Sequence, residues 1–162
     1  MGLIAGIALI AGIDLCIKEE IEARDSSEFP KELKGGKIIL HKSHNEGFPF
    51  QVLKNHPNLV KIIPVMVISG LTGIFCFLIP KKGYWIEKFS LMLTLGGAVS
   101  NLYDRFTRNY VVDYFSINVK KLNKVIFNLG DISIFAGSFL LVFSQAVSDI
   151  VQLAKRAAKK KK

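Results

Sequence analysis

Cysteine is scarce in this chain, and charge is missing altogether from four long segments. The two cysteines, Cys16 and Cys76, lie among apolar residues, which predicts small buried side chains and excludes a disulfide framework or a cysteine-rich metal site. The 22 lysines and arginines and the 13 aspartates and glutamates all lie outside residues 1–13, 62–79, 89–103 and 132–148. A soluble helical domain would distribute charge along every helix to make a polar face. This segregation, in a chain that is 50% hydrophobic, instead predicts helices within a bilayer.

The composition gives no support to a metal cofactor or to a nucleic-acid partner. The three histidines, His41, His44 and His56, lack the i, i+4 spacing of a zinc pair on a helix, so we expect no cofactor. Most of the net charge of +9 comes from the C-terminal end, where residues 155–162 contribute +6. A basic tail after an apolar helix is typical of a cytoplasmic end beside anionic lipid, so membrane lipid is the expected partner.

The apolar segments predict a membrane all-α bundle of four transmembrane helices with a small external β-sheet. We expect the helices at about residues 1–17, 60–80, 86–106 and 129–150. Only the second approaches, by itself, the roughly 20 apolar residues that a spanning helix needs. The others reach this length by admitting Asp14 in the first, Asn101 and Asp104 in the third, and Asn128 and Asp131 in the fourth. Ionisable groups at membrane depth are costly and usually mark a functional site.

The polar segments predict the orientation of the chain. Residues 18–58 are rich in proline and glycine, and we expect them outside the cell, with short strands at 37–40 and 48–53. The loop 81–88 carries three lysines against one glutamate, which predicts a cytoplasmic loop and two cytoplasmic termini. The basic segment 105–124 disagrees with this placement, but we let the short loop and the tail decide. We therefore expect a single domain at residues 1–154, followed by the basic tail 155–162.

Polar side chains follow one face of each of two predicted helices. On the third helix they recur at steps of three or four: Ser90, Thr94, Gly97, Asn101, Asp104 and Arg108. On the fourth helix Asp131, Ser138 and Gln145 recur at seven-residue steps. We expect both faces to meet inside the bundle, where most of these residues serve interhelical hydrogen bonding and close packing.

Two aspartates are harder to explain by packing. Asp113 and Asp131 lie in apolar surroundings, and we expect both at the external ends of the third and fourth helices. Two carboxylates close together in a partly dehydrated site share a proton, because they cannot both ionise easily. Such a pair can hydrolyse a peptide bond, since one member takes a proton from water while the other polarises the carbonyl. An alternative is a small ion- or proton-coupled transporter in which Asp14 joins these two residues.

Five short motifs occur in a specific order along the chain. They are Asp14-x-x-x-Lys18, Asn45-x-Gly47-x-x-Phe50, Gly97-Ala98-x-x-Asn101-x-x-Asp104-Arg105, Val111-Val112-Asp113-Tyr114 and Phe127-Asn128-x-x-Asp131. In this order and spacing the chain resembles signal peptidase II, the lipoprotein signal peptidase family of bacteria, from about residue 10 to residue 138. The resemblance implies a four-helix membrane aspartyl endopeptidase of the bacterial inner membrane. Its implied substrate is a diacylglyceryl-modified prolipoprotein, cut before the lipidated cysteine.

The resemblance also implies a role for each motif residue. Asp113 and Asp131 correspond to the catalytic pair of the family. The residues that position the substrate or support the pair are Asp14, Lys18, Asn45, Gly47, Asn101, Asp104, Arg105 and Asn128. Among these we expect Asp104 to pair with Arg105, and Asn128 to donate to a developing oxyanion. We expect the protein to act as a monomer and without a metal.

Overall fold

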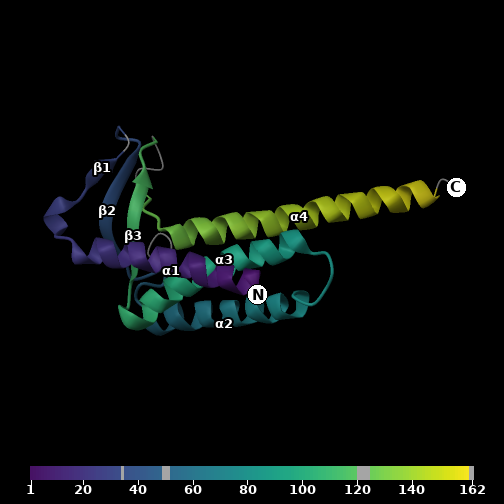
Figure 1. The fold of residues 1–162 in the computed structure, drawn as a ribbon, viewed down its shortest axis with the longest axis horizontal. Helices are drawn as coiled ribbons and strands as arrows, with labels where there is room; N and C mark the ends of the chain where they lie inside the picture. Colours follow the sequence, from purple (N-terminus) through teal and green to yellow (C-terminus); the bar gives the residue numbers. More distant parts are fainter. Residues whose placement is uncertain (34, 49–51, 120–124, 161–162) are drawn as a thin grey trace.

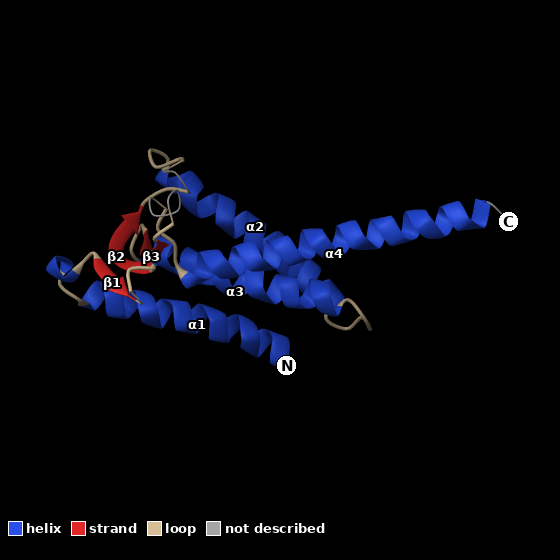
Figure 2. Cartoon of the chain, turned by 90° about the horizontal axis from the view of Figure 1, so that it is seen from above, coloured by secondary structure: helices blue, strands red, loops and turns tan. Residues whose placement is uncertain are grey.

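The protein, in a computed structural model that describes residues 1–33, 35–48, 52–119 and 125–160, is built on four helices and a three-stranded sheet. The helices are α1 (Gly2–Ala23), α2 (Pro57–Leu78), α3 (Trp85–Thr107) and α4 (Leu129–Lys160). Helix α3 is central, because it packs against all three of the others. Seen from above, α1 and α2 flank α3 and α4 on opposite sides (Figure 2). The C-terminal part of α4 projects beyond the rest of the bundle (Figure 1).

Small residues on α3 let its neighbours approach closely. A Cβ atom at Gly96 would lie 2.8 Å from Cβ of Ile10 on α1, and one at Gly97 would overlap the backbone of Gly130 on α4. Farther along α4, a Cβ atom at Gly137 would overlap the carbonyl oxygen of Ser90. Small residues at such crossings are typical of helix packing in membranes, where close van der Waals contact replaces the hydrophobic effect. These glycines thus allow α3 to pack closely against α1 and α4 at these positions.

The bundle has a polar interior and an apolar exterior. Asp14, Lys18 and Asp104 are completely buried. Large apolar side chains are exposed on the outside of all four helices, including Met66 of α2 at 68% and Phe135 of α4 at 73%. A water-soluble protein shows the opposite distribution. By length and composition, α2 and Leu129–Leu153 of α4 can cross a bilayer, whereas α1 and α3 carry more charge.

The sheet lies at one end of the bundle (Figure 1). Its strands β1 (Lys31–Leu33), β2 (Ile38–Asn45) and β3 (Val111–Ile117) are antiparallel in the order β1-β2-β3. Lys42 of β2 donates to the carbonyl oxygens of Glu22 and Arg24, each at 2.8 Å, and so caps the end of α1. Val112 and Tyr114 of β3 pack on Ile21 of α1 in a small apolar core. Strand β3 is therefore held against α1.

The structure agrees with the predicted helices and corrects several details around them. Helix α1 continues to Ala23 instead of ending near residue 17, so the polar segment between α1 and α2 is shorter than expected. Residues 38–40 of the predicted strand 37–40 lie in β2, which continues to Asn45. The predicted strand 48–53 falls partly outside the described residues. The prediction that both cysteines are buried is wrong, because both are exposed on the outside of the bundle. In this protein the outside of the bundle, and not its interior, is the apolar surface.

Of the two predicted inward-facing polar faces, the structure confirms that of α3 and contradicts most of that of α4. The α3 face is confirmed, since Ser90, Thr94 and Asp104 are buried. The α4 face is wrong beyond Asp131, because Ser138 and Gln145 are exposed. The residues of α4 that face α3 are instead Ser133, Gly137 and Ser144. Seven residues turn a helix slightly less than two full turns, and helical periodicity alone does not say which face of α4 meets α3.

Candidate active site

The two aspartates of the predicted pair come from different elements and are joined by one asparagine. Asp113 lies on β3, not at the end of α3 as expected, and Asp131 lies in the first turn of α4. The side-chain amide of Asn128 donates to Oδ1 of Asp113 at 2.8 Å, and its oxygen accepts from the backbone N–H of Asp131 at 2.7 Å. Asn128 is completely buried. One side chain thus contacts both members of the pair and sets their relative position.

The start of α4 explains how Asn128 and Asp131 are held. The backbone N–H of Asn128 donates to Oδ2 of Asp131 at 3.2 Å, while Oδ1 of Asn128 accepts from the N–H of Asp131. This reciprocal pattern is that of a capping box, in which a polar residue and an acid three positions later satisfy free N–H groups at a helix start. The Asn-x-x-Asp spacing therefore stabilises the start of α4 and also supplies an acid to the site.

Two further asparagines donate to the carboxylates. Nδ2 of Asn45 on β2 donates to Oδ2 of Asp113 at 3.1 Å, and Oδ1 of Asn45 accepts from the N–H of Gly47 at 3.2 Å. Nδ2 of Asn101 on α3 donates to Oδ1 of Asp131 at 2.8 Å. Each carboxylate therefore accepts hydrogen bonds from two directions. These bonds orient the pair without adding any charge to it.

The environment of Asp113 favours its protonated form. Burial raises the pKa of Asp113 to about 7, helped by the negative charge of Asp131 and opposed by the hydrogen bonds from Asn45 and Asn128. Burial disfavours a carboxylate because the charge loses its hydration, and a second carboxylate nearby adds repulsion. Near neutral pH a carboxyl group with this pKa can take up or release a proton, which is the property that acid–base catalysis of hydrolysis needs.

A buried ionic network lies beside the pair. The ammonium of Lys18 contacts Oδ2 of Asp14 at 2.8 Å and Oδ2 of Asp104 at 3.3 Å. Oδ1 of Asp14 accepts from the hydroxyl of Tyr114 at 2.9 Å and from the N–H of Leu129 at 3.0 Å. Asp14 thereby links α1 to β3 and to the start of α4, where a helix favours a negative charge. The network holds the elements that carry Asp113 and Asp131.

The expected pairing of Asp104 with Arg105 is wrong. Asp104 instead forms ion pairs with Lys18 and Arg108, and its Oδ2 accepts from the N–H of Val112 on β3 at 3.1 Å. Arg105 donates to the carbonyl oxygen of Gly47 at 2.9 Å, and its guanidinium lies 4.9 Å from the ring centre of Phe48. Consecutive residues on a helix point in different directions, whereas residues four apart share a face. Asp104 therefore meets Arg108.

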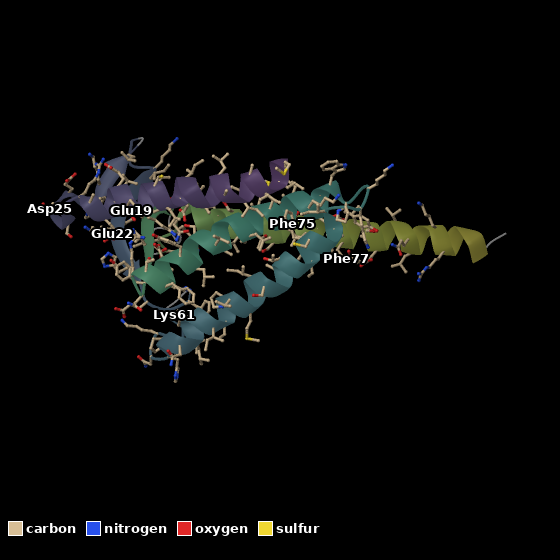
Figure 3. All side chains as sticks on the ribbon, turned by 60° about the horizontal axis from the view of Figure 1, so that its bottom comes forward. Glu19, Glu22, Asp25, Lys61, Phe75 and Phe77 are labelled. Carbon is tan, nitrogen blue, oxygen red and sulfur yellow. The ribbon has the colours of Figure 1, made fainter. Side chains whose placement is uncertain are left out.

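The ten residues predicted for the catalytic pair and its support lie in this one region, where α1, α3, β2, β3 and the start of α4 meet. Phe50 of the second motif lies outside the described residues. Glu19 and Glu22 of α1 lie at the same end of the molecule, whereas Phe75 and Phe77 lie toward the opposite end of α2 (Figure 3). Charge and polarity thus concentrate at the end of the bundle that carries the sheet.

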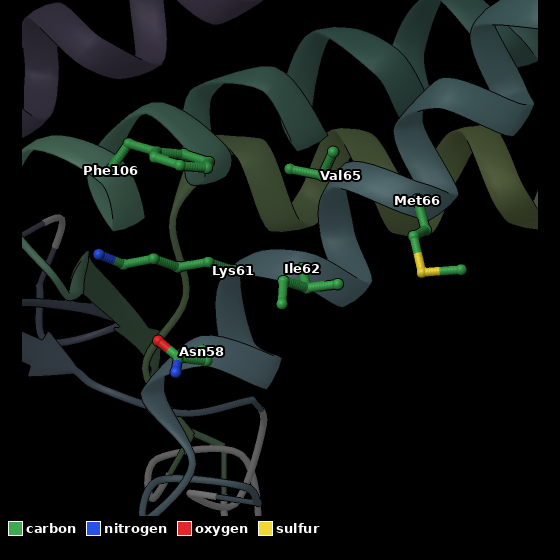
Figure 4. A pocket seen from close by; sticks show the side chains of 6 residues that line it. All are labelled: Asn58, Lys61, Ile62, Val65, Met66 and Phe106. Carbon is green, nitrogen blue, oxygen red and sulfur yellow. The ribbon is translucent and has the colours of Figure 1, made fainter.

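An apolar hollow of about 370 Å³ lies on the flank of α2 (Figure 4). Its lining comes from one face of α2 and from one residue of α3: Asn58, Lys61, Ile62, Val65, Met66 and Phe106. Lys61 donates to Oδ1 of Asn109 at 2.7 Å. The hollow contains none of the acidic residues of the network, so it is not the place of the acid–base chemistry.

Comparison with known proteins agrees with this geometry. Residues 6–147 match the family model described as signal peptidase (SPase) II. The chain belongs to the signal peptidase II family. It is 36% identical over 114 residues to a lipoprotein signal peptidase of Caldicellulosiruptor bescii, which covers 70% of this chain and 71% of that protein. It is 34% identical over 102 residues to one of Teredinibacter turnerae, which covers 62% of this chain and 61% of that protein.

The fold of this signal peptidase II family member is also that of solved bacterial membrane enzymes. One such structure, at 2.3 Å resolution, has a TM-score of 0.79 at 19% identity and covers 91% of this chain and 89% of that one. Another, at 1.9 Å resolution, has a TM-score of 0.76 at 20% identity and covers 89% of this chain and 92% of that one. The family predicted from the five motifs is therefore confirmed, and the protein is a membrane peptidase by family.

Two residues that matter to the site were not assigned a role by sequence reasoning. Tyr114 follows Asp113 in its motif, and its hydroxyl contacts Asp14 and the N–H of Leu129. Ser100 precedes Asn101, and its hydroxyl donates to Oδ2 of Asp14 at 2.5 Å. The position of Tyr114 could have been predicted from strand geometry, because neighbouring residues on a strand point to opposite faces. If Asp113 points toward Asp131, Tyr114 must point the other way, toward α1.

Proposed function

We propose that this protein is an aspartyl endopeptidase that removes signal peptides from prolipoproteins, with Asp113 and Asp131 as its catalytic pair. The observation that carries this proposal is the side chain of Asn128, which is buried and contacts both aspartates. The relatives named lipoprotein signal peptidase support the choice of substrate. The raised pKa of Asp113, about 7, supports a shared proton at neutral pH.

In this mechanism the ionised member of the pair takes a proton from the attacking water. The protonated member donates to the scissile carbonyl and later helps to protonate the leaving amine. The amide N–H groups of Asn128 point at Asp113 and at the carbonyl oxygen of Val112, at 2.8 and 3.4 Å. We therefore assign Asn128 to holding the pair, in place of the oxyanion role expected from the sequence. Asn45, Asn101 and Arg105 remain candidates for contact with the substrate.

We propose that the substrate carries a diacylglyceryl cysteine and is cut on the N-terminal side of that residue. The pair lies where the sheet meets the helices, so a scissile bond bound there would lie at the edge of the apolar surface. Each methylene group of an acyl chain that is buried in lipid contributes about 0.8 kcal/mol. Acyl chains therefore concentrate and orient a lipidated substrate at the membrane far better than side chains alone. An unmodified precursor lacks this anchor.

We propose further that all four helices span the bacterial inner membrane, with both termini in the cytoplasm, and that the single domain at 1–154 acts as a monomer. Exposed apolar side chains on α1 and α3 support this, such as Leu9 at 63% and Phe106 at 57%. Three charged residues within α1 and α3, Asp14, Lys18 and Asp104, are turned inward. Inward charge lowers the mean hydropathy of a helix without exposing that charge to lipid.

The transporter alternative requires an acid that binds and releases a transported ion. Asp14 instead forms a buried ion pair with Lys18 and accepts three further hydrogen bonds. A proton on Asp14 would break that ion pair and leave the ammonium of Lys18 with one carboxylate fewer. The connections of Asp14 thus favour a structural role and favour the peptidase over the transporter.

The test is cleavage of a lipidated prolipoprotein by the purified protein in detergent, followed on a gel. We expect Asp113→Asn and Asp131→Asn each to abolish cleavage and to leave helix content unchanged, because each keeps the shape of the side chain and removes a titratable group. The unlipidated precursor is the matched control and should be cut very slowly or not at all. Substantial cleavage by either variant would remove that residue from the catalytic pair.

A further inference from the structure

The ammonium group of Lys18 is surrounded by acceptors from α1 and α3. It lies 2.8 Å from Oδ2 of Asp14, 2.8 Å from Oδ1 of Asn101, 3.1 Å from Oγ of Ser100 and 3.3 Å from Oδ2 of Asp104. The hydroxyl hydrogen of Ser100 is directed to Asp14, so its lone pairs face Lys18. The side chain of Lys18 is completely buried. Lys18 can therefore reach the catalytic pair only through one of these neighbours.

Asn101 is the neighbour that connects Lys18 to the pair. Its Oδ1 accepts from Lys18, and its Nδ2 donates to Oδ1 of Asp131 at 2.8 Å. An ammonium group has three donors and no acceptor. Rotating the Asn101 amide by half a turn would set its NH₂ group against the ammonium and its oxygen against the carboxylate. Both contacts would be repulsive, so the charge of Lys18 permits only one orientation of this amide.

We infer that Lys18 is a positioning residue for catalysis, whose buried ammonium holds the amide of Asn101 in the orientation that donates to Asp131. With the backbone N–H of Asn128, the Asn101 amide then supplies Asp131 with a donor on each carboxylate oxygen. Hydrogen bonds of this kind favour the ionised carboxylate, which is the form that accepts the proton of water. By fixing the Asn101 donor, Lys18 supports Asp131 in the ionised form that takes the proton of water.

This inference rests on the proposed function and deepens it. It separates Lys18 from the residues that contact the substrate, since a completely buried side chain has no surface to offer a peptide. It also separates Lys18 from a lysine that only adds stability. A lysine of that second kind is Lys88, which is buried and donates to the carbonyl oxygens of Ile79 and Lys81 at the other end of α3.

The test is a double-mutant cycle on kcat and KM for the lipidated prolipoprotein. We expect Lys18→Met to lower kcat about 10- to 100-fold, the effect of losing one hydrogen bond to a charged group, and to leave KM unchanged. We expect Asn101→Ala to lower kcat by a similar factor. In the Asn101→Ala background, Lys18→Met should lower kcat no further, because the amide that Lys18 orients is gone.

The matched control is Lys88→Met, which should lower the unfolding temperature and leave kcat and KM unchanged. Lys18→Met leaves Asp14 without its cation and removes one of the two cations that pair with Asp104, so it can fail to fold. In that case the same cycle is run in the Asp104→Asn background, where one carboxylate is removed together with the ammonium. Helix content and the unfolding temperature are measured for every variant.

The outcomes separate this inference from the proposed function. If the unsubstituted protein does not cleave the prolipoprotein, the proposed function fails. If it cleaves, the inference alone is overturned by an unchanged kcat in Lys18→Met, by an effect confined to KM, or by equal losses of kcat with and without Asn101. A loss of kcat that disappears in the Asn101→Ala background supports it.

Discussion

At the scale of single residues, the site is arranged around two carboxylates that differ in their surroundings. Asp113 accepts from two side-chain amides, those of Asn45 and Asn128. Asp131 accepts from the amide of Asn101 and from the backbone N–H of Asn128. Groups of this kind titrate as a pair, so that the measured pKa values belong to both residues together. The two acids differ in one donor, which is a side-chain amide at Asp113 and a backbone N–H at Asp131.

The pH dependence of cleavage follows from the raised pKa of Asp113. The pair needs one proton, and the pKa of Asp113 near 7 means that this proton is lost as the pH rises above neutrality. We expect kcat/KM for the lipidated prolipoprotein to fall through an alkaline limb centred near pH 7. Rates measured from pH 5 to pH 9 check this. A constant rate up to pH 9 would contradict the shared proton.

The same shift predicts how Asp113→Asn changes stability. The folded-state pKa of Asp113 is raised from 3.8 to about 7, so between these values the folded protein binds more protons than the unfolded chain. Stability contributed by this group is present below pH 4 and is lost as the pH rises toward 7. Asn does not titrate, so Asp113→Asn lacks this loss of stability. We therefore expect the unfolding temperature of Asp113→Asn, minus that of the unsubstituted protein, to increase from pH 5 to pH 8. A decrease of this difference with pH would contradict the raised pKa.

At the scale of elements, the start of α4 is positioned by three neighbours. Asp14 of α1 and Tyr114 of β3 both accept from the N–H of Leu129. Gly97 of α3 lies against the backbone of Gly130. These contacts surround the first turn of α4, which carries Asp131. A displacement of this turn would separate Asp131 from Asp113 on β3.

Gly97→Ala tests this dependence. The added Cβ atom would lie 2.9 Å from the carbonyl carbon and 3.0 Å from Cα of Gly130, so the first turn of α4 must move. Overpacking of this kind costs roughly 1–3 kcal/mol of stability. We expect a lower unfolding temperature together with a fall in kcat/KM of at least about tenfold, because reacting groups need close alignment.

The control for Gly97→Ala is Gly73→Ala on α2. A Cβ atom at Gly73 has no neighbour within 4 Å. Alanine also favours a helix over glycine by about 1 kcal/mol. We therefore expect Gly73→Ala to keep full activity and to keep or raise the unfolding temperature. Equal loss of activity in the two variants would show that the packing of α3 on α4 has no special role.

At the scale of the whole molecule, polarity is divided between the two ends and the interior. The sheet and the acidic network lie at one end, and the short loop between α2 and α3 lies at the other. Helix α4 continues past this second end with Lys155 and Arg156. Basic residues on the cytoplasmic side favour one orientation in the membrane. The proposed catalytic pair would then act on the external side.

Reporter fusions test this orientation. We expect a reporter inserted after Gly36, between β1 and β2, to be active outside the cytoplasm. A reporter inserted after Lys82, between α2 and α3, should be active inside it. The two sites lie on either side of α2, so opposite signals are expected if α2 crosses the bilayer. An external signal at Lys82 would overturn the proposed four-span topology.

The sequence by itself determined the helices, the family and which residues to propose for the site. Long uncharged segments can satisfy their backbone groups in lipid only as helices, so their number and approximate bounds follow from composition. The motif residues could be named because their spacing is specific, and the polar face of α3 followed from helical periodicity. The capping box of Asn128 and Asp131 is also a local pattern, but it was recognised only in the structure.

Only the tertiary structure decided which residues meet. Asp113 lies on a strand because β3 pairs with β2, a partner about 70 positions away that no local pattern identifies. Asp104 pairs with Lys18, and α4 turns Ser138 outward, because the close approach of glycines sets how the helices pack. Local periodicity specifies which residues share a face, whereas the partner of each face depends on packing between distant segments. For this reason the orientation of Asn101 by Lys18 could be found only in three dimensions.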